Sequence, residues 1–168
     1  MQVSIIKLLN AREIALNIIT QLQGTKLSYA IQKNEKRINK ALEPLFQCNS
    51  DEQDEIEKIT INRAATDEKG ILLFTITKDK NGNDQKIYQY TKEEEIAKNA
   101  DIKLARKKYA AVRDSILSDE EGEEKTVEIE LRLATEFPKD FPANIKEAFT
   151  GIFLDPEAKE KFTLEPLK

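Results

Sequence analysis

Residues 70–91 read GILLFTITKDKNGNDQKIYQYT, and this stretch decides the fold class. Two runs rich in β-branched and aromatic residues flank Asn81-Gly82, a dipeptide that tolerates the positive φ angles of a hairpin turn. Leu72, Phe74 and Ile76 share one face of the first run, at the two-residue period of a strand. The stretch therefore predicts a β-hairpin.

The chain before this stretch predicts two helices that form an antiparallel helical hairpin over residues 1–47. Apolar residues recur at helical spacing in both of them. Gly24 occupies the position in which a left-handed residue ends a helix. Ser28 or Thr25 can cap the second helix, and Pro44 ends or kinks it, because proline removes a helical donor.

The segment before the β-hairpin gives a weaker indication of its secondary structure than the segment after it. CNSDEQDEIEKIT (48–60) opens with turn and cap residues and predicts either a short helix or the approach to a strand. Of the two, we favour a helical turn followed by a strand around residues 57–63. Beyond the β-hairpin, Thr91 and Glu94 form a capping box. This box predicts the start of a long helix over residues 92–117.

Three further elements complete the chain. TVEIELRLA alternates between apolar and polar residues, which predicts a strand over residues 126–134. Two Phe-Pro pairs lead into a short amphipathic helix over 143–153, and 155–168 is expected to be a frayed or extended tail. Because helices and strands do not alternate regularly, we predict a single α+β domain for residues 1–168, with its first strands and the β-hairpin in 57–91.

Composition restricts the chemistry that the chain can perform. None of the 168 residues is histidine, so Ser-His-Asp, Cys-His and HExxH sites cannot form. The single cysteine, Cys48, excludes an internal disulfide and fits a reducing compartment. A net charge of -4 gives no global basic field for nucleic acid or anionic lipid. Lys7, Arg12 and Glu13 interrupt the N-terminal apolar run, which is expected to be neither a signal peptide nor a membrane span.

The stretch SDEEGEEKTVEIELRL (118–133) places seven acidic side chains within sixteen positions. Paired carboxylates can bind Mg²⁺ or divide acid and base roles when they converge with other ligands in a concave site. Glu128 and Glu130 instead fall on the polar face of the predicted strand, and the other carboxylates flank Gly122 in a loop. We interpret the stretch as a solvated loop followed by an ordinary strand.

A second oxygen-rich segment, DKNGNDQKIYQY (79–90), is similar to a calcium-binding loop in its alternate positions. Its sixth position is Asp84, where such a loop needs glycine, and its twelfth is Tyr90, where it needs glutamate. We interpret this segment as the turn of the β-hairpin.

The predicted helix 92–117 has a basic half whose five cations are candidate contacts to nucleic acid or to a protein partner. They are Lys103, Arg106, Lys107, Lys108 and Arg113. The alternative is that glutamates open this helix and cations close it because the helix macrodipole favours that order. Four tyrosines and no tryptophan offer little for base stacking on single strands.

Three blocks of the sequence occur in a suggestive combination: the N-terminal apolar helix, KLSYAIQKNEKRINKALEPLF (26–46), and VEIELRLATEFPKDFPANIKEAFTGIFL (127–154), which follows QYTKEEE (89–95). Together they resemble a family of small uncharacterised proteins encoded by tailed bacteriophages. In that family a charged helical hairpin precedes a variable middle, and a strand leads into a short helix near the C-terminus. The resemblance brings no catalytic residues and implies a virion-associated or assembly protein.

We therefore expect a non-enzymatic protein without a cofactor that acts through protein–protein contacts as a phage-type virion-associated or assembly component. It is expected in the virion or in the cytoplasm of the host bacterium, without membrane contact. The β-hairpin can add a strand to a partner. The alternative is a small cytoplasmic regulator that binds a host protein or nucleic acid, and a third class is a metal enzyme that uses Glu128 and Glu130.

Overall fold

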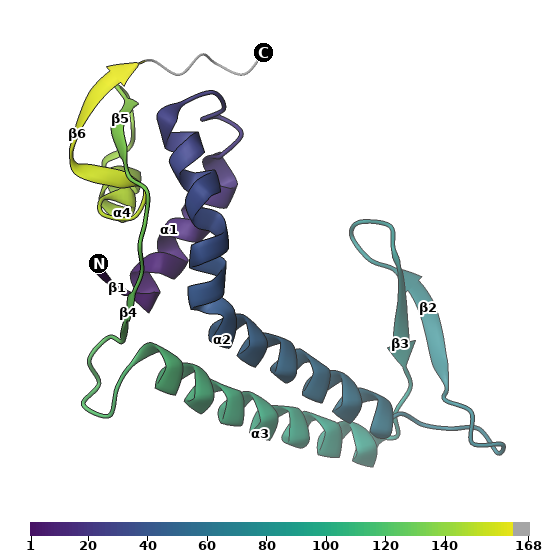
Figure 1. The fold of residues 1–168 in the computed structure, drawn as a ribbon. Coiled ribbons are helices and arrows are strands. Elements are labelled where there is room, and N and C mark those ends of the chain that lie inside the picture. The colour runs from purple at the N-terminus through teal and green to yellow at the C-terminus, as the bar shows by residue number, and fades with distance from the viewer. Residues whose placement is uncertain (163–168) are drawn as a thin grey trace. The chain divides into compact units, whose positions relative to one another are not determined.

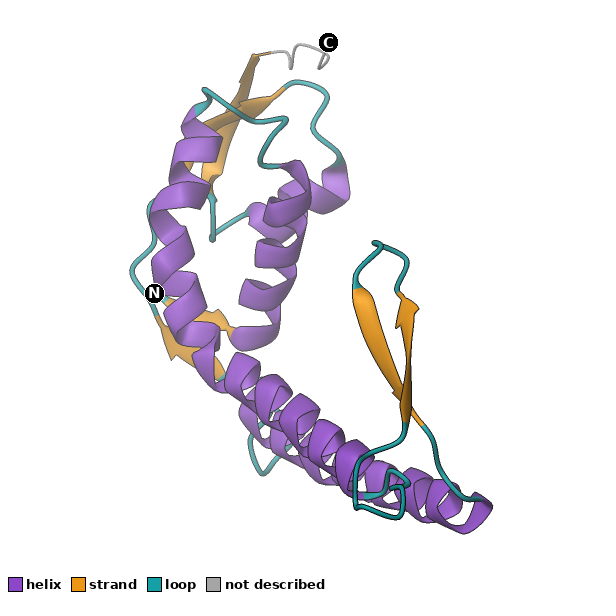
Figure 2. Ribbon diagram, turned by 90° about the vertical axis from the view of Figure 1, so that its right-hand side faces the viewer, coloured by secondary structure: helices purple, strands orange, loops and turns teal. Residues whose placement is uncertain are grey.

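The chain forms an α+β fold, as predicted, in a computed structural model that describes residues 1–162 (Figure 1). Its helices are α1 (Ile5–Ile18), α2 (Lys26–Asn62), α3 (Lys92–Leu117) and α4 (Ala143–Phe149). Its strands are β1 (Gln2–Ser4), β2 (Phe74–Lys78), β3 (Asp84–Tyr88), β4 (Thr126–Glu128), β5 (Ala134–Pro138) and β6 (Leu154–Phe162). Within this range the strands form three separate two-stranded sheets, β1–β4, β2–β3 and β5–β6 (Figure 2).

Internal contacts divide the chain into two compact units. Unit 1 comprises Met1–Leu45 and the chain from Ser115 onward, and unit 2 comprises Phe46–Asp114. The boundaries fall inside α2, just after Pro44, and inside α3. The single domain predicted for residues 1–168 stays a prediction, because two compact contact groups can still belong to one folding domain.

In unit 1, α1 and the first part of α2 form the predicted antiparallel helical hairpin. Arg12 donates a hydrogen bond from Nε to Oδ1 of Asn39 at 2.7 Å, which joins the middle of α1 to α2. Ser4 caps α1 by accepting a hydrogen bond from the Lys7 N–H. Thr25, not Ser28, caps α2, because the Thr25 Oγ1 accepts from the Ser28 N–H at 3.0 Å.

Pro44 was predicted to end or to kink the second helix, and the first alternative is wrong, since α2 continues through this residue to Asn62. Proline removes only one helical donor, and Pro44 itself is exposed. Leu42 and Leu45 are both buried, so the apolar stripe that stabilises the helix runs on past the proline. Packing of this stripe outweighs the missing hydrogen bond.

The predicted strand around residues 57–63 is also wrong, because this segment is the last part of α2. Its β-branched residues Ile59, Thr60 and Ile61 favour a strand by propensity alone. In the structure Ile59 is half-buried, and the Thr60 hydroxyl donates to the Ile56 carbonyl at 2.7 Å, a bond that a helix permits. Tertiary context overrides local propensity here.

The strand predicted over 126–134 is divided into β4 and β5. β4 pairs antiparallel with β1, with Val127 opposite Val3, whereas β5 pairs with the distant β6 in parallel. The chain between them keeps the predicted alternation, with Ile129 buried and Arg132 exposed. Ile129 still exchanges two backbone hydrogen bonds with Met1, and the pairing with the N-terminal strand ends there.

Buried Asn34 of α2 explains that interruption. Its amide group donates to the carbonyl oxygens of Arg132 at 2.8 Å and Ile152 at 3.0 Å, and its Oδ1 accepts from the Arg132 N–H at 2.8 Å. A side chain from another element thereby satisfies both backbone groups of Arg132, so the ladder stops there.

The C-terminal elements complete the core of unit 1. The helix predicted over 143–153 ends at Phe149, and Gly151 adopts a φ of 79°. The tail over residues 155–168 was predicted to be frayed or extended. Its first part is extended, because it forms most of β6; its last part lies outside the described residues.

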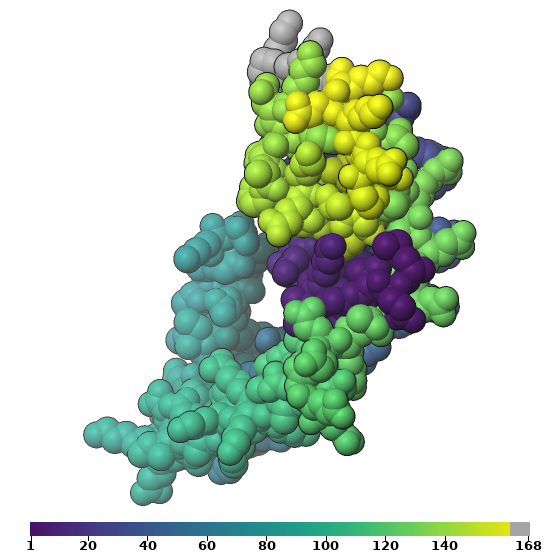
Figure 3. Space-filling model, turned by 90° about the vertical axis from the view of Figure 1, so that its left-hand side faces the viewer, coloured from purple at the N-terminus to yellow at the C-terminus, as the bar shows by residue number. Residues whose placement is uncertain are grey.

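The core of unit 1 contains a cluster of aromatic rings. Four phenylalanines, Phe137, Phe141, Phe149 and Phe153, form a continuous series of ring contacts. Figure 3 shows the N-terminal residues packed beside α4 and β6.

Candidate functional site

The predicted β-hairpin is present in unit 2 as β2 and β3, which pair antiparallel and, among the strands of residues 1–162, only with each other. Its turn is centred differently from the prediction, because Asn81 does not have a positive φ and only Gly82 does, at 83°. Asp79 organises the turn: its Oδ1 accepts from the N–H groups of Asn81 and Asn83 at 2.8 and 2.9 Å. These bonds, first of all the one from Asn83, lower the pKa of the Asp79 carboxyl.

The same turn occurs three times within residues 1–162, and the sequence reasoning missed it. In each copy an aspartate accepts hydrogen bonds from the N–H groups two and four residues later, and a glycine with positive φ lies three residues after the aspartate. The copies run 67–71 (DEKGI), 79–83 (DKNGN) and 119–123 (DEEGE). The spacing Asp-x-x-Gly was the signal that would have found them.

One face of the β-hairpin presents apolar side chains to solvent. Phe74 lies opposite Tyr88, with their rings edge to face at 6.0 Å, and Ile76 lies opposite Lys86. Ile76 is 61% exposed. The ammonium of Lys86 lies 4.9 Å from the centre of the Phe74 ring. This face therefore combines exposed apolar side chains with the charged residues Lys78, Asp84 and Lys86.

The other face is exposed as well. It carries Ile87, which is 49% exposed and lies opposite Thr75. Of the ten residues in β2 and β3, nine are exposed and only Tyr88 is half-buried. A two-stranded hairpin without a covered face is marginally stable in water. Figure 2 shows the two strands extending from the loops at the ends of α2 and α3, and no helix of unit 2 crosses either face.

The rest of unit 2 also buries little apolar surface. Within Phe46–Asp114, all of which is described, the buried apolar residues are Cys48, Ala64 and Ala105, and the buried polar residue is Glu52. Each of these apolar side chains is small. The larger apolar residues of the unit are half-buried or exposed, so unit 2 has no large side chain in a closed core.

Ion pairs between α2 and α3 occupy two of the five candidate cations. Arg113 donates to the carboxylate of buried Glu52. Lys108 lies 2.6 Å from Glu55, which also accepts from the Tyr109 hydroxyl at 2.9 Å. These two bonds lower the pKa of the Glu55 carboxyl, the Lys108 bond most strongly. Arg113 and Lys108 therefore hold the two helices of unit 2 together.

The other three candidate cations point outward. Lys103, Arg106 and Lys107 are exposed, and among the described residues none of them forms an ion pair. Their spacing of three and four residues places them on one side of α3. Leu104, 67% exposed, lies next to them in sequence. The structure thus divides the predicted basic half into a packing pair and an exposed trio.

The acidic side chains of residues 118–133 lie in solvent, as predicted. Glu128 and Glu130 are exposed, and the Glu130 carboxylate lies 3.9 Å from Arg37. Ser4 donates a hydrogen bond to Glu124, beside the turn that Asp119 organises. Within residues 1–162, no group of three or more Cys, Asp or Glu side chains is arranged to hold a metal ion.

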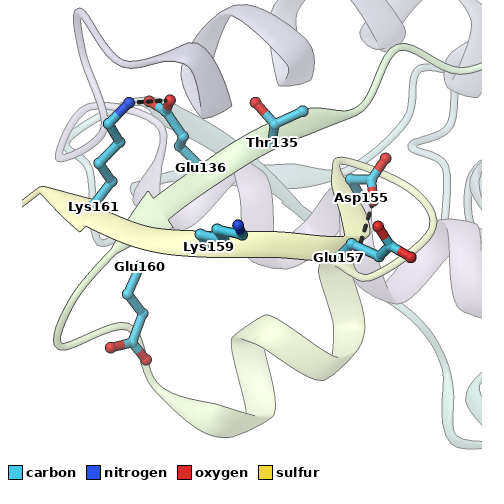
Figure 4. A pocket seen from close by; sticks show the side chains of 7 residues that line it. All are labelled: Thr135, Glu136, Asp155, Glu157, Lys159, Glu160 and Lys161. Carbon is cyan, nitrogen blue, oxygen red and sulfur yellow. Dashed lines mark hydrogen bonds and ion pairs between the residues drawn. The ribbon is translucent and has the colours of Figure 1, made fainter.

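Unit 1 contains an open hollow of about 540 Å³ beside β5 and β6 (Figure 4). It is lined by Thr135, Glu136, Asp155, Glu157, Lys159, Glu160 and Lys161. Two of its four acids, Glu136 and Asp155, accept hydrogen bonds. Glu136 lies 2.8 Å from Lys161 and 3.0 Å from Lys26, and these cations, Lys161 first, lower its pKa. Asp155 accepts from the Glu157 N–H at 2.8 Å. With four acids and two lysines the lining is acidic, and its charged groups do not converge on one point as a catalytic site requires.

Comparisons of this chain with protein-family models, with curated proteins and with solved structures found no match. Among the helices of residues 1–162, none has both the length and the apolar composition needed to cross a membrane.

Proposed function

We propose that this protein is a non-enzymatic phage-type component, virion-associated or acting in assembly, that works through protein–protein contacts made by the β2–β3 hairpin of unit 2. The observation that carries the proposal is the exposure of apolar side chains on both faces of a hairpin that pairs with no third strand.

Physical chemistry favours a covered hairpin over a bare one. Its edges carry unpaired N–H and C=O groups that can pair with another chain, and its exposed Phe74 and Ile76 gain free energy when removed from water. Both requirements are met by a protein that adds a strand or packs on the apolar face. A small-molecule ligand would leave the edges unpaired.

The phage setting in this proposal rests on the sequence resemblance. Unit 1 supplies a stable platform with a phenylalanine core, and unit 2 supplies the surface for a partner. Such a division of labour suits a small component that must fold alone and then join a larger structure.

The test is quantitative mass spectrometry of purified virions and of assembly intermediates from the source that encodes the chain. We expect the protein at a fixed ratio to the major structural proteins in one of these fractions. The double variant Phe74→Ser/Ile76→Ser should lose this association, whereas Thr75→Ser/Thr77→Ser, on the opposite face of the same strand, should retain it. Absence of the wild-type protein from both fractions would contradict the proposal.

A second candidate function, contact with nucleic acid, is favoured by the exposed trio Lys103, Arg106 and Lys107. It predicts binding to duplex DNA or RNA with an affinity that falls steeply as salt rises, by a logarithmic slope of about 0.9 for each phosphate contacted. Neutralising the trio to glutamine should flatten this slope, whereas the control Lys36→Gln/Lys40→Gln should not. A salt-independent affinity would exclude this candidate.

A further inference from the structure

The two edges of the β2–β3 hairpin differ in what they present. Two backbone hydrogen bonds fix the alternation of the ladder: the Asp79 N–H donates to the Asn83 carbonyl at 2.9 Å, and the Gln89 N–H donates to the Leu73 carbonyl at 2.9 Å. In an antiparallel pair, directly opposite residues alternate between hydrogen-bonded and non-hydrogen-bonded pairs. Thr75 therefore bonds inward to β3, and its neighbours in β2 direct their N–H and C=O groups outward.

The outward-directed residues of β2 are Phe74, Ile76 and Lys78, and those of β3 are Asp84, Lys86 and Tyr88. Charged residues at outward positions are a common protection against edge pairing. β3 carries charges at its first two such positions. β2 carries an aromatic and an aliphatic residue and a single lysine at its end, so β2 is the less protected edge.

We infer that β2 pairs antiparallel with β2 of a second copy of this chain, about a two-fold axis through Ile76. This inference rests on the proposed function and names its partner. Ile76 then lies opposite Ile76 of the second copy, and Phe74 lies opposite Lys78. Every outward N–H and C=O group of one strand meets a complementary group of the other, because the outward residues fall opposite outward residues in this register.

The side chains agree with this register. Thr75 falls opposite Thr77 of the second copy, and threonine pairs are favourable across antiparallel strands. No like charges lie directly opposite each other, and the single cation, Lys78, meets the ring of Phe74. The equivalent two-fold pairing along β3 would place Lys86 opposite Lys86, which is unfavourable.

The pairing also repairs the weakness of the isolated hairpin. Two two-stranded hairpins become one four-stranded sheet, and three or more strands with an apolar face are needed for independent stability. Directly opposite residues in antiparallel strands project to the same face. Phe74 and Ile76 of both copies therefore form an apolar strip across the middle of one face, with Ile76 at its centre and Lys78, Asp84 and Lys86 beside it.

The closing experiment measures the mass of the full chain by sedimentation equilibrium at concentrations up to about 1 mM, the range in which weak specific association is detected. We expect a monomer–dimer equilibrium. Ile76→Pro should raise the dimer dissociation constant about tenfold or more, because both outward N–H donors at the centre are lost. Lys86→Pro is the matched control, since it removes the outward donor directly opposite on β3, and it should leave dimerisation unchanged.

Disulfide cross-linking tests the register independently of any effect of proline on folding. In a Cys48→Ala background, Ile76→Cys should form a disulfide dimer under mild oxidation, since Cα atoms in a hydrogen-bonded antiparallel pair lie about 5.5 Å apart. Lys78→Cys should remain a monomer, because its counterpart lies several residues away. Equal cross-linking of both variants, or dissociation by Lys86→Pro as strongly as by Ile76→Pro, would overturn the inference.

The outcomes separate this inference from the proposed function. A wild-type chain that stays monomeric at all concentrations overturns self-association. If Phe74→Ser/Ile76→Ser still abolishes virion or intermediate association in that case, the proposed function stands and the hairpin serves a different protein. If the chain dimerises through β2 but occurs in neither fraction, the inference stands and the proposed phage role fails.

Discussion

Unit 1 and unit 2 are held together by different interactions. Unit 1 encloses large apolar side chains, among them Phe149, Phe153 and Leu8, and satisfies its buried backbone with Asn34. Unit 2 encloses only small ones and joins its helices through ion pairs, including Arg113 with Glu52. The difference indicates that unit 1 provides stability and that unit 2 provides surface.

The largest expected effect comes from comparing the same truncation in the two units. Phe149→Ala in unit 1 should lower the free energy of unfolding by about 3–5 kcal/mol, the usual cost of a cavity left by a buried phenylalanine. Phe74→Ala in unit 2 should cost less than about 1 kcal/mol in the monomer, because that ring is partly exposed. Urea unfolding measured at low protein concentration checks both values. Similar losses for the two variants would mean that unit 2 has a core of its own.

The next largest effect is expected from removing the buried side-chain amide of Asn34 from unit 1. Asn34→Leu should destabilise the chain by about 2–3 kcal/mol or more, since the carbonyl and N–H of Arg132 and the carbonyl of Ile152 lose their partner. Thermal unfolding followed by circular dichroism is the measurement. The exposed neighbour Lys33→Leu serves as the control and should change little. An unchanged melting temperature for Asn34→Leu would show that the amide does not support the core.

The smallest effect depends on pH. The pKa of Glu136 in unit 1 is lowered by Lys161 and Lys26, so its contribution is complete above the unfolded carboxyl pKa of about 4.3 and is lost as the pH falls through the lower folded value. The difference in melting temperature between wild type and Glu136→Gln should therefore be present at neutral pH and shrink as the pH falls below about 4. A difference that is equal at both pH values would contradict the ion-pair explanation.

Sequence reasoning succeeded where local chemistry decides the structure. The capping box predicted the start of α3, and Thr91 and Glu94 do exchange hydrogen bonds there. The alternation of the β-hairpin placed β2 and β3 correctly, and the polar face of Glu128 and Glu130 is exposed as expected.

The failures arise from distant residues. Pro44 does not stop α2 because Leu42 and Leu45 are buried on its two sides, and burial depends on the rest of unit 1. The strand predicted over 126–134 is interrupted because Asn34, far away in sequence, bonds its backbone. No single-segment pattern contains that information.

The candidate site was only partly predictable. The sequence named the five cations of α3 and the hairpin, but it could not show that Lys108 and Arg113 are held by Glu55 and Glu52. It also could not show that both hairpin faces lack a covering element, because exposure is a property of the whole fold. The repeated Asp-x-x-Gly turn was visible in the sequence and could have been found.

Hydrogen–deuterium exchange on the dilute full-length chain tests the division between the two units most directly. We expect the amides of Thr75 and Thr77 in the hairpin to exchange with little protection, because few buried contacts oppose local opening there. The amides of α1 and of the first part of α2 should be strongly protected, and hairpin protection should rise with protein concentration. If Thr75 and Thr77 were protected as strongly as α1 in a dilute monomer, this would contradict the claim that the hairpin of unit 2 is only marginally stable without a partner.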